Sequence, residues 1–293
     1  MVGSKKWLLG LGLLAGAGVA QAQTLYASSA AGGPGELYIL NPANGALVQD
    51  LGPLNDATGA NYGITGLAFH PTTGVLYGSS ANANAATRAK LVTINPLTGS
   101  VTLIGLFNAG PVNSSGVPAT MSDIAFDSAG NLFGVGSIGG PQLYSINTAT
   151  GKATVIGGSG LTSTTGGGLA ISSGGTFFGT PTASRFGTYD SVTGSFTNIA
   201  NPVKPVGGAY AALAFDGAGV LYGLNLGSGS PPPTHLVTFD TATGAINDLG
   251  ASLNMLDAIA FQPVPEPATL IVLGLGLAGT LARRRRSAAV KLR

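Results

Sequence analysis

The chain has 293 residues, of which 8% are charged, 44% are hydrophobic and 48 are glycine, and it contains no cysteine. So much hydrophobic content with so little charge argues against intrinsic disorder and favours short strands joined by glycine-rich turns. The lack of cysteine excludes a disulfide framework, a thiolate zinc site and a cysteine nucleophile.

The net charge of +2 is divided unevenly along the chain. Lys5 and Lys6 precede the first apolar run and six of the thirteen basic residues follow the last run, which leaves five between them. Ten of the eleven acidic residues lie in that middle region, so its net charge is about −5. The basic residues therefore report membrane topology, and the middle offers no basic patch for nucleic acid.

Residues 1–22 are predicted to be a secretory signal peptide. Lys5 and Lys6 form its charged start, residues 7–19 form a short apolar run, and Ala20 and Ala22 are the small residues that a signal peptidase needs. We expect cleavage after Ala22. The alternative is an uncleaved anchor, which the short run disfavours, and export through a membrane follows in either case.

Residues 23–263 form an internal repeat. An apolar residue, an alanine and then Phe or Ile recur five times, with the alanines at Ala68, Ala125, Ala170, Ala214 and Ala260. A second element follows a few residues later in four units, as in VLYGSS from Val75, and LYASS from Leu25 is its fifth copy. Both elements have the composition of short strands joined by hairpin linkers.

A third element of the repeat is a hairpin turn with the pattern Asn/Asp-x-x-(Thr/Asn)-Gly. The first residue caps the turn through its side chain, and the glycine takes the left-handed position of a type I turn with a bulge. The turn glycines are Gly45, Gly99, Gly151, Gly194 and Gly244. Each unit therefore holds four short antiparallel strands in about 45 residues, the size of a propeller blade.

The two ends of the repeat are complementary. The first unit lacks its first strand, and the last copy of that strand, LDAIAF from Leu256, stands alone. If this copy pairs with residues 25–29, the ring closes and its strand edges are protected. We predict an all-β fold, a five-bladed β-propeller closed by its N- and C-terminal strands. A ring with a degenerate extra blade and an open β-sandwich or solenoid are the alternatives.

The turn repeats resemble those of quinoprotein-like and lactonase-like propellers. That resemblance is general to the fold, and it carries no catalytic residue across to this chain.

Residues 264–293 are predicted to be a sorting signal. Pro265, Glu266 and Pro267 form a rigid, extended segment, because each proline fixes its own φ and restricts the residue before it. An apolar helix over residues 268–282 would be about 22 Å long, short for a hydrocarbon core of about 30 Å. The cluster Arg283, Arg284, Arg285 and Arg286 would stop transfer and stay in the cytoplasm.

This order of Pro-Glu-Pro, short apolar helix and arginine cluster resembles the PEP-CTERM sorting signal of Gram-negative bacteria. The resemblance implies recognition by an exosortase, a multi-pass membrane protease-transpeptidase, followed by loss of the tail. It also implies a link with exopolysaccharide and biofilm export. We therefore expect an intermediate tethered to the inner membrane, and then a cell-surface or extracellular protein.

The sequence contains no recognisable catalytic motif. A GxGxxG match from Gly274 lies in the apolar tail without a preceding strand, so it does not indicate dinucleotide binding. His70 is expected to hydrogen-bond in a turn, and His235, after three prolines, is expected in an exposed loop. Neither histidine supports a metal site or an activated nucleophile, so we predict no catalytic residue, no metal and no cofactor.

The acidic residues divide into two groups. Those at repeat-equivalent turn positions are expected to be structural, namely Asp127, Asp190, Asp216 and Asp240. Asp123 and Asp257 differ, because they precede the innermost strand in two units where the other units have no acid. Departures from a repeat are where function can lie, since the repeated structure does not require them.

Two aromatic residues join this second group. Tyr62 and Tyr210 enter the same class of loop in other units, so we name Tyr62, Asp123, Tyr210 and Asp257 as candidate contacts for a polar or sugar-like ligand. The simpler alternative is that they are solvated loop residues.

Three functions are compatible with the sequence. The first is an exported, non-catalytic propeller that binds or scaffolds, in an exopolysaccharide matrix. The second is a propeller hydrolase or lactonase, which would need convergent acids or a bound metal at the channel mouth. The third is a purely structural surface protein. The expected processing partners are a signal peptidase and an exosortase-type membrane protease, and no nucleic acid is expected to bind.

Overall fold

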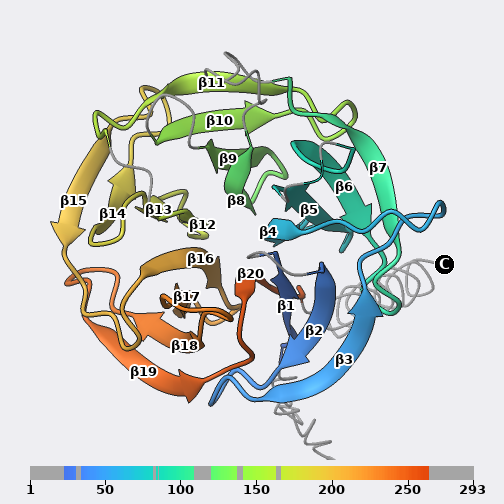
Figure 1. Ribbon diagram of the computed structural model, residues 1–293. Coiled ribbons are helices and arrows are strands. Elements are labelled where there is room, and N and C mark those ends of the chain that lie inside the picture. Colours follow the sequence, from blue (N-terminus) through green and yellow to red (C-terminus); the bar gives the residue numbers. More distant parts are fainter. Residues whose placement is uncertain are drawn as a thin grey trace, which may run out of the picture.

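The computed structural model describes residues 23–30, 34–81, 84, 86–108, 120–136, 141–162 and 166–263. Within these residues the chain forms twenty strands, arranged as five four-stranded antiparallel sheets around a central axis (Figure 1). The predicted five-bladed propeller is therefore confirmed.

The first blade joins the two ends of the repeat. It contains β20 (Leu256–Phe261), β1 (Leu25–Ser29), β2 (Glu36–Leu40) and β3 (Leu47–Pro53), in that order from the axis outward. Leu25 pairs with Phe261 and Ala27 with Ile259, so the last strand supplies the inner strand of the first blade. This is the closure that the sequence predicts.

The other four blades each use four consecutive strands, and the first strand of each lies nearest the axis (Figure 1). The second blade contains β4 (Ile64–Phe69), β5 (Leu76–Ser80), β6 (Lys90–Ile94) and β7 (Val101–Leu106), and the third contains β8 (Met121–Phe126), β9 (Leu132–Gly136), β10 (Gln142–Ile146) and β11 (Ala153–Gly158). The fourth contains β12 (Gly168–Ile171), β13 (Phe177–Thr180), β14 (Phe186–Tyr189) and β15 (Phe196–Ala200), and the fifth contains β16 (Ala209–Phe215), β17 (Leu221–Leu226), β18 (Thr234–Phe239) and β19 (Ile246–Ala251).

The hairpin turns have the geometry that their sequence demands. The five turn glycines have φ between 68° and 75°, in the left-handed region that only glycine adopts freely. In the second blade Asn95 Oδ1 accepts a hydrogen bond from Leu97 N at 2.9 Å, which is the expected cap. His70 also behaves as predicted, because its Nδ1 accepts from the backbone N–H of Thr72 at 3.2 Å.

The acidic turn residues have the structural role that the repeat predicts. Their carboxylates each accept backbone N–H groups two residues further on, as shown by Asp127, Asp190, Asp216 and Asp240. They shape the turns, and their hydrogen-bonding capacity is largely used there.

The two faces of the ring differ in their connections. One face, here called the hairpin face, carries short turns such as 95–100 and 127–131. The opposite loop face carries the connections between blades, whose described examples vary in length from 252–255 to 54–63. Residues 23 and 263 both lie on the hairpin face, where Gln23 Nε2 donates to Gln262 O at 3.1 Å. The described chain therefore begins and ends side by side.

Neighbouring blades pack through aromatic residues at the end of the inner strands. Phe69 meets Tyr26 of the preceding blade with ring centroids 5.3 Å apart, and Phe261 meets Tyr222 at 4.8 Å. Two further interfaces use Phe126 with Tyr77 and Phe215 with Phe178. The hydrophobic clusters lie between blades, so each blade depends on its neighbours for burial.

One predicted location is wrong. His235 lies in β18 rather than in a loop, and its Nδ1 is 3.0 Å from the carboxylate of Asp248 on β19. The loop ends with Pro233, because β18 begins at Thr234 and His235 already pairs with Asn225 of β17 and Ala251 of β19.

The predicted signal peptide and sorting tail, residues 1–22 and 264–293, lie outside the described residues. Their cleavage site, apolar helix and arginine cluster therefore stay predictions. The part of the chain that the structure describes contains no helix long and apolar enough to cross a membrane.

Removing closure contacts should destabilise the whole ring. Ile259 on β20 is fully buried beside Leu25 and Leu224, so Ile259→Ala should lower the free energy of unfolding by about 2–5 kcal/mol. Urea denaturation measures this change. Val192→Ala is the control, because Val192 is 81% exposed and its truncation should shift the value by less than about 0.5 kcal/mol. Equal midpoints for both variants would show that β20 does not hold the ring.

Candidate functional site at the loop-face mouth of the channel

A set of β-bulges shapes the loop-face end of the central channel. The pairing of β4, β8, β16 and β20 with their neighbours skips Thr65, Ser122, Ala211 and Asp257, which are equivalent in the repeat. In the fourth blade the equivalent residue is Gly167, just before β12. A bulge redirects the extra residue and occurs often beside functional sites. We call these five residues the bulge ring.

The bulge ring lines a cavity of about 210 Å³ at the loop face. Thr120, Ala209 and Tyr210 add to its wall. Thr65 Oγ1 donates to Met121 O at 2.7 Å, so this hydroxyl links two blades. The cavity is therefore lined by residues of all five blades and depends on closure of the ring.

Asp257 is the acidic residue in the lining of this cavity. It is partly buried, and its carboxylate has neither a hydrogen bond nor an ion pair within the described part of the chain. Burial raises the pKa of Asp257 to about 7. Near neutral pH this carboxyl group therefore exists in both protonation states and faces an open cavity.

Asp123 lies deeper, on the axis, and has a different role. It is fully buried, and its Oδ2 accepts from Leu169 N at 2.9 Å and Leu213 N at 3.1 Å, while Oδ1 accepts from Ile124 N. The three donors are repeat-equivalent residues on the inner strands of three blades. Burial raises the pKa of Asp123, and the three N–H groups offset part of that rise by favouring the carboxylate.

The inner strands pack very closely around Asp123. A Cβ atom on Gly66 would lie 2.8 Å from Asp123 Cα and 2.7 Å from Ile124 N, closer than real side chains approach. A Cβ atom on Gly168 would lie 2.7 Å from the side chain of Leu213. The channel is therefore constricted at this level, and Asp123 belongs to the constriction rather than to the cavity.

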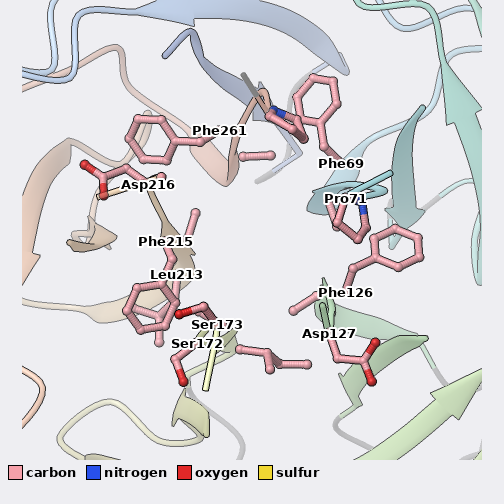
Figure 2. Close-up of a pocket in the computed structure, with 18 of the residues that line it drawn as sticks. Phe69, Pro71, Phe126, Asp127, Ser172, Ser173, Leu213, Phe215, Asp216 and Phe261 are labelled. Atoms are coloured by element: carbon pink, nitrogen blue, oxygen red, sulfur yellow. The ribbon is translucent and has the colours of Figure 1, made fainter. Parts of the chain in front are cut away.

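A second cavity lies at the hairpin face, with a volume of about 270 Å³. The five repeat alanines line it, and Figure 2 shows Phe69, Phe126, Phe215 and Phe261 around its opening. Three of its polar residues, Asp127, Asp216 and Ser172, already accept backbone hydrogen bonds in turns. The two cavities share no lining residue, and this one offers mainly apolar surface.

The structure brings together two of the four predicted contacts. Asp257 and Tyr210 line the loop-face cavity, although the Tyr210 ring is buried and its hydroxyl donates to Val203 O at 2.5 Å. Asp123 lies beneath the cavity. Tyr62 is outside it, buried in a core cluster with its hydroxyl on Asp56 Oδ2 at 3.1 Å.

The alternative that the two acids are solvated loop residues is wrong, because both lie within strands. The sequence also treats them as equivalent, whereas they differ by one position in the repeat. Asp257 aligns with Ser122 and Asp123 aligns with Ala258. Thr65 and Ser122 are cavity residues that the sequence reasoning missed, and their alignment with Asp257 is the signal that could have found them.

No group of three or more His, Asp or Glu side chains among the described residues is placed to hold a metal ion. The chemistry visible at the loop face is therefore that of one carboxyl group with hydroxyl groups around it.

The fold is a five-bladed β-propeller with one cavity at each end of its channel. The carboxyl group of Asp257, which has no partner among the described residues, lies in the cavity at the loop face. By sequence, the chain belongs to the repeat family of unknown function DUF6923, whose model matches residues 27–248. The PEP-CTERM protein-sorting motif matches residues 263–286, so the protein carries the signal of an exported, envelope-directed protein. A search of curated proteins finds no match to this chain.

Among solved structures, the chain is similar to TolB from Acinetobacter baumannii, with 13% identity and a TM-score of 0.41 over 79% of this chain. It is also similar to a protein of unknown function from Bacteroides thetaiotaomicron, with 15% identity and a TM-score of 0.43 over 78% of this chain. The chain spans only 52% and 50% of the lengths of these two proteins. Neither similarity bears on function.

Replacing Asp123 by asparagine should destabilise the ring. Asn has one acceptor oxygen, so at least one of the three backbone N–H groups would lose its partner and face an NH₂ group. We expect Asp123→Asn to lower the free energy of unfolding by about 2–3 kcal/mol in urea denaturation. Asp50→Asn is the control, since Asp50 is exposed on β3 and Asn keeps its acceptor for Gly52 N. Higher stability in Asp123→Asn would mean that burying the charge costs more than these bonds contribute.

Asp257 should make stability fall as pH rises. Its folded pKa of about 7 lies above the unfolded value near 3.8, so the folded state binds the extra proton between these values. The protonated Asp257 contributes its full share to the free energy of unfolding below about pH 4. This contribution is lost as pH rises through about 7, and the total loss is at most about 4 kcal/mol. Urea denaturation from pH 4 to 8 should show this loss in the native protein and a shallower one in Asp257→Asn. Equal slopes would contradict the assignment.

Proposed function

We propose that this protein is an exported, non-catalytic propeller that binds or scaffolds at the cell surface or outside the cell, in an exopolysaccharide matrix. The observation that carries the proposal is the position of the sorting motif. The motif begins at residue 263, and the last propeller strand ends at Phe261. The closed ring is thus joined almost directly to the segment that an exosortase would cleave.

The position of residue 263 supports one orientation for the proposed tethered intermediate. Residue 263 leaves the ring on the hairpin face, beside Gln23. A tail inserted in the membrane would hold the hairpin face toward the bilayer, because almost no chain separates the last strand from the motif. The loop face and its cavity would then point away from the membrane, available to a ligand before and after release.

The hydrogen bonds of Asp123 support a non-catalytic role. Hydrolysis by a pair of carboxyl groups requires both to reach the substrate. Asp123 is fully buried and occupied by three backbone N–H groups, which leaves Asp257 as the acid that faces the cavity. Binding needs one accessible carboxyl group, and the cavity provides that.

A hydrolase or lactonase is the second candidate, and the Asp257 pKa of about 7 favours it, because a general acid–base group works best near the ambient pH. Turnover of lactones or glycosides that disappears in Asp257→Asn would support this candidate over binding. A purely structural protein is the third candidate, supported if deletion changes biofilm texture while no binding is found.

Changing the Pro-Glu-Pro segment should block release. Replacing Pro265, Glu266 and Pro267 by alanine removes the rigid extended segment that the protease would engage. We expect the variant to accumulate in the inner membrane with its tail attached, while the native protein reaches the cell surface or medium without it. Antibodies against the tail and against the propeller, applied to each fraction, measure this.

The control is Pro96→Ala, the same change in a turn on the hairpin face, which should leave release intact. A native protein that stays in the inner membrane with Arg283 to Arg286 attached would contradict the processing route. Binding to the matrix is tested in a separate experiment. The released protein should co-sediment with the producer's own matrix. Failure to do so would favour the structural alternative.

A further inference from the structure

The loop-face cavity holds negative charge without a counterion. The Asp257 carboxylate has no cationic partner within the described part of the chain, and the ion pair found there joins His235 to Asp248 instead. A second carboxyl group, that of Asp123, lies beneath the cavity, and the charge of Asp257 adds to the burial that raises the pKa of Asp123. A partly desolvated carboxylate of this kind is stabilised when a cation reaches it.

The rest of the lining adds hydrogen-bonding groups and space. The hydroxyl groups of Thr120 and Ser122 line the cavity, and neither makes a hydrogen bond to another described residue. Gly167 and Ala211 line the cavity without a polar side chain, and Gly167 packs closely against the side chain of Ser122, where a Cβ atom would lie 2.5 Å from Ser122 Cβ. One carboxylate and two free hydroxyl groups provide four acceptor oxygens, two for the ammonium group on the carboxylate and two for neighbouring ligand hydroxyls on Thr120 and Ser122.

The cavity size restricts the ligand to a small unit. Its volume of about 210 Å³ is below the range of about 300–1,000 Å³ that holds drug-sized ligands. It suits a single ring or the end of a chain rather than an extended oligosaccharide.

We propose that the loop-face cavity binds a primary ammonium group carried by a small hydroxylated unit, the chemistry of an unacetylated amino sugar. This inference rests on the proposed binding function and specifies its ligand class. The ammonium group pairs with Asp257, and the ring hydroxyls meet Thr120 and Ser122. A neutral sugar lacks the charge that the cavity leaves unbalanced, and Ca²⁺ generally needs more oxygen ligands than one carboxylate and two hydroxyls supply.

The test uses three sugars that share one ring. Isothermal titration of the released protein at pH 6.5 should show binding of glucosamine and at least about tenfold weaker binding of glucose and N-acetylglucosamine, which have no charged amine. Asp257→Asn should lose at least about tenfold in affinity for glucosamine. Asp50→Asn removes one exposed acid from β3 and should bind like the native protein.

A second variant keeps the test independent of the charge change. Ala211→Leu fills the cavity without altering Asp257, so it should also weaken glucosamine binding at least about tenfold. Urea midpoints for each variant establish that it is folded before binding is compared.

The affinity should also depend on pH. The titratable groups at the cavity are Asp257 and Tyr210, with Asp123 beneath, and only Asp257 changes from protonated to ionised between pH 5.5 and 7 while exposed to the ligand. Affinity should therefore rise by about 15-fold over this range, in which an amine stays charged. Asp257→Asn should remove the rise.

The outcomes separate this inference from the proposed function. If the three sugars bind equally, or Asp257→Asn binds as the native protein does, the ligand class is wrong. The proposed function then stands if the protein still sediments with the matrix. If the protein binds neither glucosamine nor the matrix, both proposals fail.

Discussion

The Asp123 carboxylate holds the centre of the molecule together by accepting three backbone N–H groups from the inner strands of three blades. Inner strands have one edge paired within the blade and one edge facing the axis, where water is excluded and a lone N–H group is costly. Gly66 and Gly168 pack so closely against their neighbours that a second carboxylate side chain would not fit there. One carboxylate therefore satisfies several strand edges and divides the channel into two separate mouths.

This division assigns different roles to the two faces. The hairpin face is built from short turns with repeated chemistry, and its cavity presents alanine and phenylalanine side chains whose polar neighbours are already hydrogen-bonded. Both described ends of the chain lie there, and the sorting motif begins at residue 263 on this face. The loop face carries the connections that vary, and variable loops on a rigid scaffold are where binding groups are placed most readily. The loop-face cavity and the start of the sorting motif thus lie on opposite faces.

Much of the architecture could be predicted because the repeat is encoded locally. Turn glycines, period-two strands and the isolated LDAIAF copy determine blade number, hairpins and closure, and all of these are found. The site could be predicted only in part, since a bulge adds one residue and shifts the alternation without a sequence marker. Asp123 and Asp257 both stand near the start of an inner strand, but they lie two and three residues before the repeat alanine and therefore point to different surroundings. Tyr62 lies outside the cavity, because it stands two positions earlier in the repeat than Tyr210, which lines the cavity.

The position of Asp257 is informative because the fold does not require an acid there. The equivalent residues of the bulge ring are Thr65, Ser122, Gly167 and Ala211, and the other blades close with these uncharged residues. A carboxyl group at this point is partly desolvated, has no counterion in the described structure and costs stability as pH rises toward 7. An acid at a position where serine satisfies the fold conflicts with the stability of the repeat, and residues that conflict with stability in this way often lie at functional sites. The cost is offset when a cation enters the cavity, so the same group that weakens the empty ring favours the occupied one.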